Sequence, residues 1–533
     1  MARFKKIADF WLKSHMSLKG RVLIGNSLMM SIPRYALKFL EVQGPTAIAL
    51  EKEYYRLIWD DKYRTISDIQ SCCPAKVGGI GCLDLHCIQE AIAVTFMARM
   101  ESRQDLHWVQ LAIQRMIDTP SRTKLPLKPV LHAPWYQAIS VRPPKAEDSL
   151  RHITTVWYHL WAQRAERGPI QLRPPTTTEQ VLGTCFWYHP DLRVTQGVGA
   201  RRFNTMAMKS LCNEGAMLLG DLWDPETHSP IIPVGLGATQ AKCRAKEIIA
   251  LCNDFPQAWK DLLHSGNTVT GPLSLRKELC LFVENKHFDI AKCSFRTCYR
   301  AILAWKCRNV DFSEQTRGPA RAYAMITGRK ISDQEVWKAA RNQFVLPKSG
   351  DLLWRLLHNK VRTGKRLTWL SKEQQHCPID GCDLTIEHIW IECLTAQAVW
   401  QEFSALWEFF GTGKANIPKN KNELLALWAV GPYKSRLTNR RWRILYTTLV
   451  WCLWKAYLSF SFGESLDTLN PNGMRAHFRL MVLSKIHTDR TLSLNQNYTG
   501  KDYNAKVFEE LWGEAPAAMR VSAQPLCLRP KQK

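Results

Sequence analysis

Hydrophobic residues recur at helical spacing through most of this chain. Near its start, apolar positions lie three or four residues apart at Phe4, Ile7, Ala8, Trp11 and Leu12, which is typical of one buried helix face. Further apolar stretches cover residues 22–35, where Pro33 is an interruption, and residues 91–100 and 107–117. The pattern predicts a helical block over residues 1–125.

The pattern changes in the middle of the chain. Residues 119–145 are rich in Pro and in basic side chains, which favours an extended linker. Residues 126–270 as a whole mix short helical patterns with Pro- and Thr-rich turns, and we assign them no chemistry. Linker and turns together separate the N-terminal helical block from the C-terminal half of the chain.

Regular patterns return after this middle region. The run Leu279–Val283 predicts a strand, and residues 299–307 and 333–344 predict helices. From residue 350 onward the chain is helical again, apart from one short segment rich in Cys and His. We therefore expect a mainly α fold: a multi-domain helical protein with a short β-containing middle segment.

Composition indicates the class of partner. The 533 residues include 73 Lys and Arg against 47 Asp and Glu, a formal net charge of +26. Such an excess predicts a polyanion, because Lys and Arg placed on phosphates release condensed counterions. An anionic membrane surface is the alternative. No window reaches about 18 uninterrupted apolar residues, so we expect no membrane-spanning helix and no membrane partner.

The N-terminal residues and the cysteine content indicate the cellular compartment of the protein. The N-terminus lacks the apolar core of a secretory signal and opens directly into a helical pattern, so we expect an earlier part of a longer protein to be missing. The 17 Cys are odd in number and scattered. This is typical of an intracellular reducing compartment, nuclear or cytoplasmic.

One segment carries ligand-type residues at short spacing: Cys377, Cys382, His388 and Cys393, in the pattern C-x4-C-x5-H-x4-C. Zinc favours four thiolate or imidazole ligands in a tetrahedron, and two short chelating pairs supply them. A site with four protein ligands leaves no open position for water, so the zinc would be structural. The alternative is two buried thiols with an unrelated His and Cys. The pattern predicts a zinc knuckle.

Basic and aromatic residues alternate in several places, and we select candidates for nucleic-acid binding from two of them. The first lies near the start of the chain, and the second directly precedes the knuckle. The candidate residues are Lys19, Arg21, Arg355, Lys360, Arg362, Lys365 and Arg366. Arg and aromatic side chains together can bind phosphates and stack on bases. Each cluster alone could instead be a solvated helix face.

Two blocks of the sequence resemble non-long-terminal-repeat (LINE-type) retrotransposon reverse transcriptases. In the N-terminal block (residues 11–92), the segments SLKGR, RLIWDD and GGIGCLDL resemble the helical thumb region. In the C-terminal block (residues 288–454), the similarity to the reverse-transcriptase zinc-binding domain falls on the knuckle and on Trp354, Leu357, Lys360, Thr363, Arg366 and Leu367. The blocks occur in the family's order.

The resemblance implies four regions and a function. The regions would be a thumb-like helical region (1–125), a linker and unassigned middle (126–270), the zinc-binding domain (271–410) and a C-terminal helical region (411–533). The chain would be a C-terminal fragment that binds RNA or DNA, template or primer, and that partners the missing polymerase and endonuclease portion. The alternatives are a domesticated zinc-dependent nucleic-acid-binding protein and a protein-interaction scaffold.

No residue is selected as catalytic. Asp60 and Asp61 follow a helical pattern and lack the upstream carboxylate that two-metal polymerase chemistry needs, so we interpret them as a helix cap or a turn. Gly78, Gly79 and Gly81 lack the spacing of a phosphate loop and predict a turn. The parent would be an RNA-directed DNA polymerase, but the palm is absent from this sequence. We do not expect this chain alone to be an enzyme.

Overall fold

The structure is a computed structural model, and it describes most but not all of the chain. The described residues are 2–38, 44–61, 64–103, 105–118, 156, 168–186, 189, 192–194, 201–202, 211–212, 214–232, 238–265, 272–274, 276, 279–283, 286–342, 346–367, 369–410, 413–463, 470–494 and 505–513. The predicted linker at 119–145 lies outside them. Within the described residues, no helix is long and apolar enough to cross a membrane.

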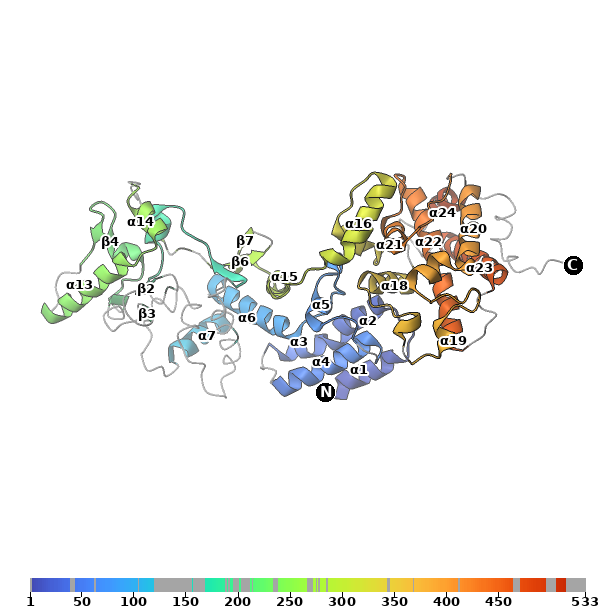
Figure 1. The fold of residues 1–533 in the computed structure, drawn as a ribbon. Coiled ribbons are helices and arrows are strands. Elements are labelled where there is room, and N and C mark those ends of the chain that lie inside the picture. The colour runs from blue at the N-terminus through green and yellow to red at the C-terminus, as the bar shows by residue number, and fades with distance from the viewer. Residues whose placement is uncertain are drawn as a thin grey trace. The chain divides into compact units, whose positions relative to one another are not determined.

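The chain forms two compact units, each built from several separate segments. Unit 1 comprises Met1–Phe4, Asn26–Glu53 and Leu83–Arg308, and unit 2 comprises Lys5–Gly25, Tyr54–Cys82 and Asn309–Lys533. Two helices, α1 (Ala2–Leu12) and α4 (Gly44–Trp59), contribute residues to both. Both units are mainly helical, which confirms the predicted fold class (Figure 1).

In its described part, unit 1 combines helices with three small antiparallel sheets. Its helices are α3 (Ser31–Ala36), α6 (Leu85–Ser102), α7 (His107–Asp118), α11 (Thr178–Leu182), α13 (Ala238–Asn253), α14 (Gln257–Leu263) and α15 (Phe295–Lys306). The most extensive helix contact is between α6 and α15. It is fixed at one end by Lys306, whose Nζ lies 2.6 Å from Asp84 Oδ2, and by the Tyr299 hydroxyl, which accepts a hydrogen bond from the Asp84 amide at 3.0 Å.

The largest sheet of unit 1 has three strands in the order β1–β6–β7. They are β1 (Ile170–Leu172), β6 (Leu279–Val283) and β7 (Lys286–Asp289), all antiparallel. Two further two-stranded ladders are β2 (Arg193–Val194) with β3 (Arg201–Arg202), and β4 (Trp223–Asp224) with β5 (Ser229–Pro230). The central strand β6 is the strand that the run of apolar residues predicts.

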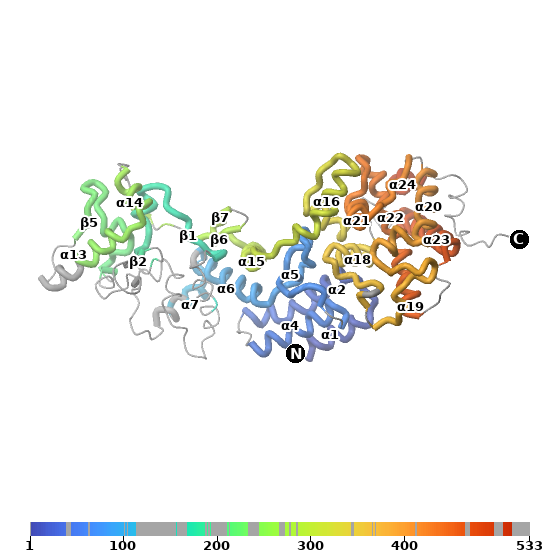
Figure 2. The backbone as a smooth tube through the Cα atoms, viewed as in Figure 1, coloured from blue at the N-terminus to red at the C-terminus, as the bar shows by residue number. Residues whose placement is uncertain are grey.

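Unit 2 is a helical assembly. Its helices are α2 (Leu18–Ile24), α5 (Asp68–Cys72), α16 (Ser313–Thr327), α17 (Asp333–Ala339), α18 (Pro347–Leu357), α19 (Lys372–Gln375), α20 (Leu394–Phe409), α21 (Lys421–Val430), α22 (Arg436–Ser461), α23 (Pro471–Leu494) and α24 (Ala505–Trp512). Figure 2 shows α20, α22 and α23 grouped in the C-terminal part, and α23 contacts both of the others.

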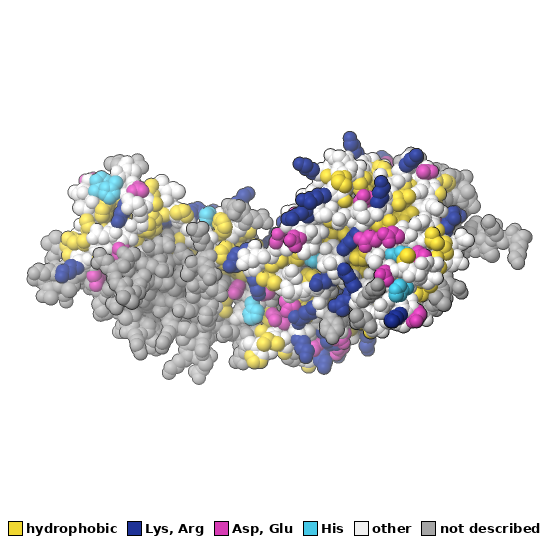
Figure 3. Space-filling model, viewed as in Figure 1, with side chains coloured by type: hydrophobic (Ala, Val, Ile, Leu, Met, Phe, Trp, Pro, Cys, Tyr) yellow, Lys and Arg dark blue, Asp and Glu magenta, His cyan; other side chains and the backbone are white. Residues whose placement is uncertain are grey.

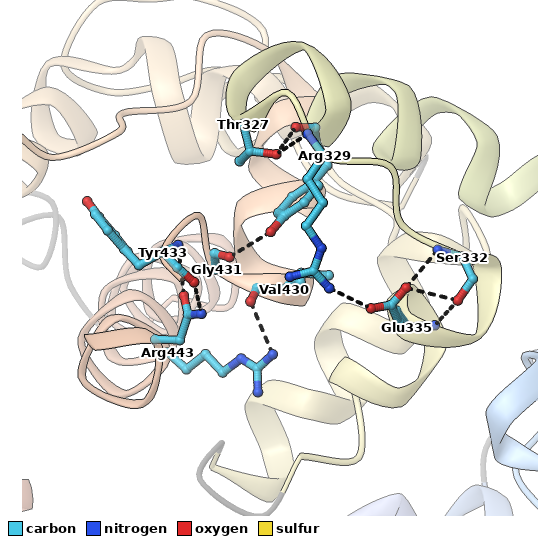
Figure 4. A network of polar contacts seen from close by, with 10 residues as sticks. Thr327, Arg329, Ser332, Glu335, Val430, Gly431, Tyr433 and Arg443 are labelled. Atoms are coloured by element: carbon cyan, nitrogen blue, oxygen red, sulfur yellow. Dashed lines mark hydrogen bonds and ion pairs between the residues drawn. The ribbon is translucent and has the colours of Figure 1, made fainter. Parts of the chain in front are cut away.

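Polar contacts fix the helix ends in unit 2, as Figure 4 shows. Ser332 begins α17 with a capping box, in which its hydroxyl accepts from the Glu335 amide and Glu335 accepts from the Ser332 amide. Arg329 lies 3.1 Å from the same Glu335 carboxylate. Arg443 of α22 donates to the Val430 carbonyl at 3.1 Å, where α21 ends. These bonds satisfy backbone groups that the helix ends would leave without partners.

The turn at Gly78 connects the early segments of unit 2 to α18. Trp354 Nε1 donates to the Gly78 carbonyl at 2.9 Å, and His358 Nε2 lies 2.8 Å from the same oxygen. Gly78 has φ +107°, and a Cβ there would come within 2.8 Å of the Phe312 ring and 2.9 Å of the Trp337 ring. Only glycine fits this position. Residues of the N-terminal and C-terminal blocks therefore share one core.

Most sequence-predicted elements are present, with small differences at their ends. The helix expected from residue 299 starts earlier, at Phe295, because Ser294 caps it by accepting from the Thr297 amide. The helix expected over 333–344 ends at Ala339, and residues 343–345 lie outside the described part. The glycine turn is confirmed, and Asp60 and Asp61 end α4 in a turn with φ near +60°.

The interruption expected at Pro33 was placed wrongly. The helical path instead departs from regular α geometry upstream, in a π-helical turn at Gly25–Met29, and Pro33 lies within α3. Pro33 is the third residue of α3 and lies in its first turn. Backbone N–H groups there have no partner inside the helix, so the missing N–H of proline costs little.

His358 makes the stability of unit 2 sensitive to acid. Burial lowers the pKa of His358 from 6.5 to about 4, so the folded form binds fewer protons than the unfolded form between these values. Above about pH 6.5 the neutral histidine leaves the free energy of unfolding at its full value. As the pH drops toward 4, protonation of the unfolded form lowers that free energy by at most about 3 kcal/mol.

We therefore expect the wild-type protein to melt at a lower temperature near pH 5 than near neutral pH. His358→Gln keeps a donor for Gly78 but does not titrate, so it should remove part of that difference. Calorimetry of both proteins across this range is the measurement. Identical pH dependence in the two proteins would contradict the assignment to His358.

Candidate metal centre

The Cys/His segment forms a compact hairpin followed by a helical turn. The Cys377 amide donates to the Cys382 carbonyl at 2.8 Å, and the Gly381 amide donates back to the Cys377 carbonyl at 2.8 Å. Gly381 has φ +70°, which a glycine adopts without strain. The chain then enters a π-helical turn, His388–Glu392, and α20 begins after Cys393. The backbone hydrogen bonds of this hairpin thus bring Cys382 back beside Cys377.

Four potential ligand atoms gather at this place. They come from Cys377, Asp380, His388 and Cys393 and all lie within 4.8 Å of one another. The two sulfur atoms are 3.7 Å apart, too far for a disulfide. In a tetrahedron with metal–sulfur bonds of about 2.3 Å, two sulfurs are separated by about 3.8 Å. The spacing of these thiols is therefore that of two ligands on one zinc ion.

The imidazole of His388 faces the group, and one of its ring nitrogens lacks a hydrogen-bond partner. Its Nε2 is buried and has no hydrogen-bond partner, although Asp380 Oδ1 is 3.3 Å away. The ring is positioned from its backbone, since the His388 amide donates to the Thr385 hydroxyl at 3.0 Å. A buried nitrogen without a partner is costly, and coordination of a metal would remove that cost.

The two buried thiols differ in acidity. The hydrogen bond from Cys377 lowers the pKa of Cys393, and His388 contributes in the same direction. The same bond raises the pKa of Cys377. The hydrogen bond with Cys393 in turn raises the pKa of His388. One thiolate is thus already favoured, which suits a cation because zinc binds the thiolate form.

Cys382, the fourth predicted ligand, is placed differently from the other three. Its thiol is exposed and is not one of the four gathered groups. Its amide donates to Asp380 Oδ1 at 3.2 Å, and the nearby Asp380 carboxylate raises the pKa of its thiol. Asp380 occupies the fourth place instead. The donor set of two thiols, an imidazole and either oxygen or a third thiol fits zinc.

A buried tryptophan connects this centre to α22. Trp390 lies in the turn between His388 and Cys393, donates from Nε1 to the Val450 carbonyl at 3.0 Å, and accepts at its own carbonyl from Trp400 Nε1 at 2.7 Å. Its ring stacks on Trp454 with centroids 5.4 Å apart. The metal centre is therefore anchored to the longest helix of unit 2.

Four of the predicted nucleic-acid-binding residues line one pocket of unit 2, which we call the basic pocket. It has a volume of about 430 Å³ and includes Arg21, Arg355, Lys360 and Arg362. Lys19 and Arg366 are exposed but do not line it, and the Lys365 side chain lies outside the described part. Elsewhere, Lys and Arg are interspersed with Asp and Glu on the face that Figure 3 shows.

The sequence analysis did not select several residues at these sites. Asp380 was overlooked, although a ligand-type residue two positions before Cys382 was a usable signal. Trp451 and Trp454 line the basic pocket, but they were not selected, although they lie within the block that resembles the family. Helical spacing does not tell which face of α22 meets basic residues that lie far away in the chain.

Comparison with known proteins agrees with this geometry. Residues 319–400 match the family described as zinc-binding in reverse transcriptase. The chain carries a region related to retrotransposon reverse transcriptases. It is also 24% identical over 543 residues to the transposon TX1 uncharacterized 149 kDa protein of Xenopus laevis, which covers 93% of this chain. The chain spans 37% of that relative's length.

We expect the reverse-transcriptase-related region to bind about one zinc ion per chain. Cys393→Ser should abolish stoichiometric binding, because it removes a thiolate from the centre of the group. Cys307→Ser, a thiol of unit 1 outside the gathered set, is the matched control and should keep the metal. Elemental analysis after desalting measures both. Wild-type protein that is free of metal would contradict the assignment.

Proposed function

We propose that this chain is a non-catalytic C-terminal fragment of a retrotransposon reverse transcriptase, and that it binds an RNA or DNA template or primer through its basic zinc-knuckle domain. The observation that carries the proposal is the joint placement of the Cys/His centre and the basic pocket in unit 2. Zinc would be structural: when bound, it holds the hairpin and the start of α20 together.

For the zinc we propose the ligands Cys377, Cys382, His388 and Cys393. Three of them are already gathered. Cys382 and Asp380 compete for the fourth position, and they share one hairpin in which the Cys382 carbonyl accepts from the Cys377 amide. A thiolate is the softer donor, and structural zinc sites are built from thiolates and imidazoles. Asp380 would then be a neighbour of the metal rather than a ligand.

Two single variants separate these possibilities. Cys382→Ser should lower the affinity for zinc by at least about 10-fold, whereas Asp380→Asn should change it less, because only the first removes a ligand. Substitution by Co²⁺ provides a second readout, since its absorption reports the number of bound thiolates. The reverse order of the two effects would assign the fourth position to Asp380.

The proposal includes four regions and the parent protein's other parts. We propose a thumb-like region over 1–125, a linker and unassigned middle over 126–270, the zinc-binding domain over 271–410 and a helical region over 411–533. The partners would be RNA, DNA and the polymerase and endonuclease portion of the parent. The described cysteines are free thiols, which supports a reducing compartment, nuclear or cytoplasmic.

The salt dependence of RNA binding tests the function. If three or four phosphates are neutralised, the logarithm of the affinity for single-stranded RNA should fall with the logarithm of salt with a slope of about −2 to −3. The double variant Arg355→Gln/Arg362→Gln should flatten that slope by about 1.4. Titrations of the zinc-loaded full chain with a labelled strand measure it.

The matched control removes the same charge elsewhere in unit 2. Arg317 and Arg321 are exposed on α16 and do not line the pocket, so Arg317→Gln/Arg321→Gln should leave the slope nearly unchanged. Equal effects of the two double variants would argue against the basic pocket as the binding site. Absence of salt-linked binding in wild type would favour the scaffold alternative.

A further inference from the structure

We propose that the basic pocket holds one unstacked nucleotide of a single-stranded nucleic acid, with its phosphate at the Arg355 side and its base against Trp451. The inference rests on the proposed function and specifies which form of nucleic acid is bound. All of the pocket's lining residues belong to unit 2, and most of them come from the segment that contains α2, from α18 and the residues after it, and from α22.

The size of the pocket selects its occupant. At about 430 Å³ it lies in the range of pockets that enclose small ligands. A sphere of that volume is roughly 9 Å across, whereas a base pair within a duplex is joined to two sugar–phosphate backbones and stacked on its neighbours. A base pair within a duplex therefore cannot enter. A base that is splayed out of a single strand can, and such bases are what proteins read in single-stranded nucleic acid.

The lining of the pocket carries an excess of positive charge. Lys348, Arg355, Lys360 and Arg362 belong to it, and none of them forms an ion pair with a carboxylate in the described part of the chain. The two acidic residues of the lining are otherwise engaged. Asp60 lies 3.0 Å from Arg21, and Asp351 accepts from the Leu18 amide at 2.6 Å.

The surroundings of Arg355 disfavour its charged form. Arg355 keeps part of its surface exposed, but desolvation by the surrounding protein lowers the pKa of its guanidinium, Asp351 opposes this shift, and nearby Arg21 adds to it. A bound phosphate would relieve the crowding of positive charge, and its oxygens match the forked donors of a guanidinium. This part of the pocket is therefore suited to the backbone of a strand.

The same lining also contains aromatic rings. Trp451, Trp454 and Tyr457 of α22 belong to it. Trp454 already stacks on Trp390, but Trp451 is half-buried and has no ring partner among the described residues. Phe462, just beyond α22, is 58% exposed where it lines the same pocket. Aromatic rings that served only as core would be fully buried. Trp451 and Phe462 instead keep part of their ring surface exposed, and a base could stack there.

The test compares ligands and one pair of matched variants of the zinc-loaded full chain. Near physiological salt, a labelled single-stranded oligonucleotide should bind more tightly than a duplex of equal length and more tightly than a free nucleoside triphosphate. Trp451→Leu should weaken single-strand binding by about 5- to 100-fold, the worth of one base stacking on an aromatic ring, with the salt slope unchanged. Trp369→Leu, at an exposed Trp (64%) outside the pocket, should have little effect.

A second measurement does not depend on a variant that folds. Photo-crosslinking of wild-type protein to a strand carrying a photoreactive uridine should label the tryptic peptide of residues 444–455, which contains Trp451. Crosslinks only elsewhere, equal effects of the two Trp variants, or preferential binding of duplex or of free nucleotide would each overturn the inference. Salt-linked binding could survive any of these results, so the proposed function would fail only if the wild-type chain bound no nucleic acid.

Discussion

The backbone carbonyl of Gly78 accepts from both Trp354 and His358, and much of unit 2 depends on that contact. A buried carbonyl without donors would cost about 1–3 kcal/mol, so the turn and α18 stabilise each other. Adjacent residues of a helix point about 100° apart. With Trp354 directed into the core, Arg355 is left exposed at the wall of the basic pocket. The fixed tryptophan thus determines where the neighbouring cation lies.

The metal centre and the basic pocket are linked through α22. Trp390 of the knuckle turn donates to the Val450 carbonyl and stacks on Trp454, and Trp454 also lines the pocket. Tyr457, one turn further along, accepts from the Gly364 amide at 3.3 Å, which places the basic segment after α18 against the same helix. Disruption of the turn that contains Trp390 would therefore also disturb the aromatic residues that line the pocket.

Local patterns allowed much of the fold to be predicted. Apolar periodicity identified α6, α7 and β6, because each signal lies within a single element. The ligand spacing identified the segment that contains the metal centre. It selected Cys382 and overlooked Asp380, which occupies the same hairpin, because spacing carries no information on side-chain orientation. The basic pocket could not be predicted from the sequence for a different reason. Its lining comes from segments far apart in the chain, and only tertiary packing brings Arg21, Arg355 and Trp451 into one pocket.

The segmented composition of unit 2 has a consequence for its synthesis. Its first two segments, Lys5–Gly25 and Tyr54–Cys82, leave the ribosome long before Asn309 and the rest of the third segment. Until then Gly78 lacks the donors of α18, and closing so long a loop slows folding. Exposed apolar surface on these early segments would invite aggregation or chaperone binding in the meantime. Unit 2 is thus completed only after most of unit 1 has been made.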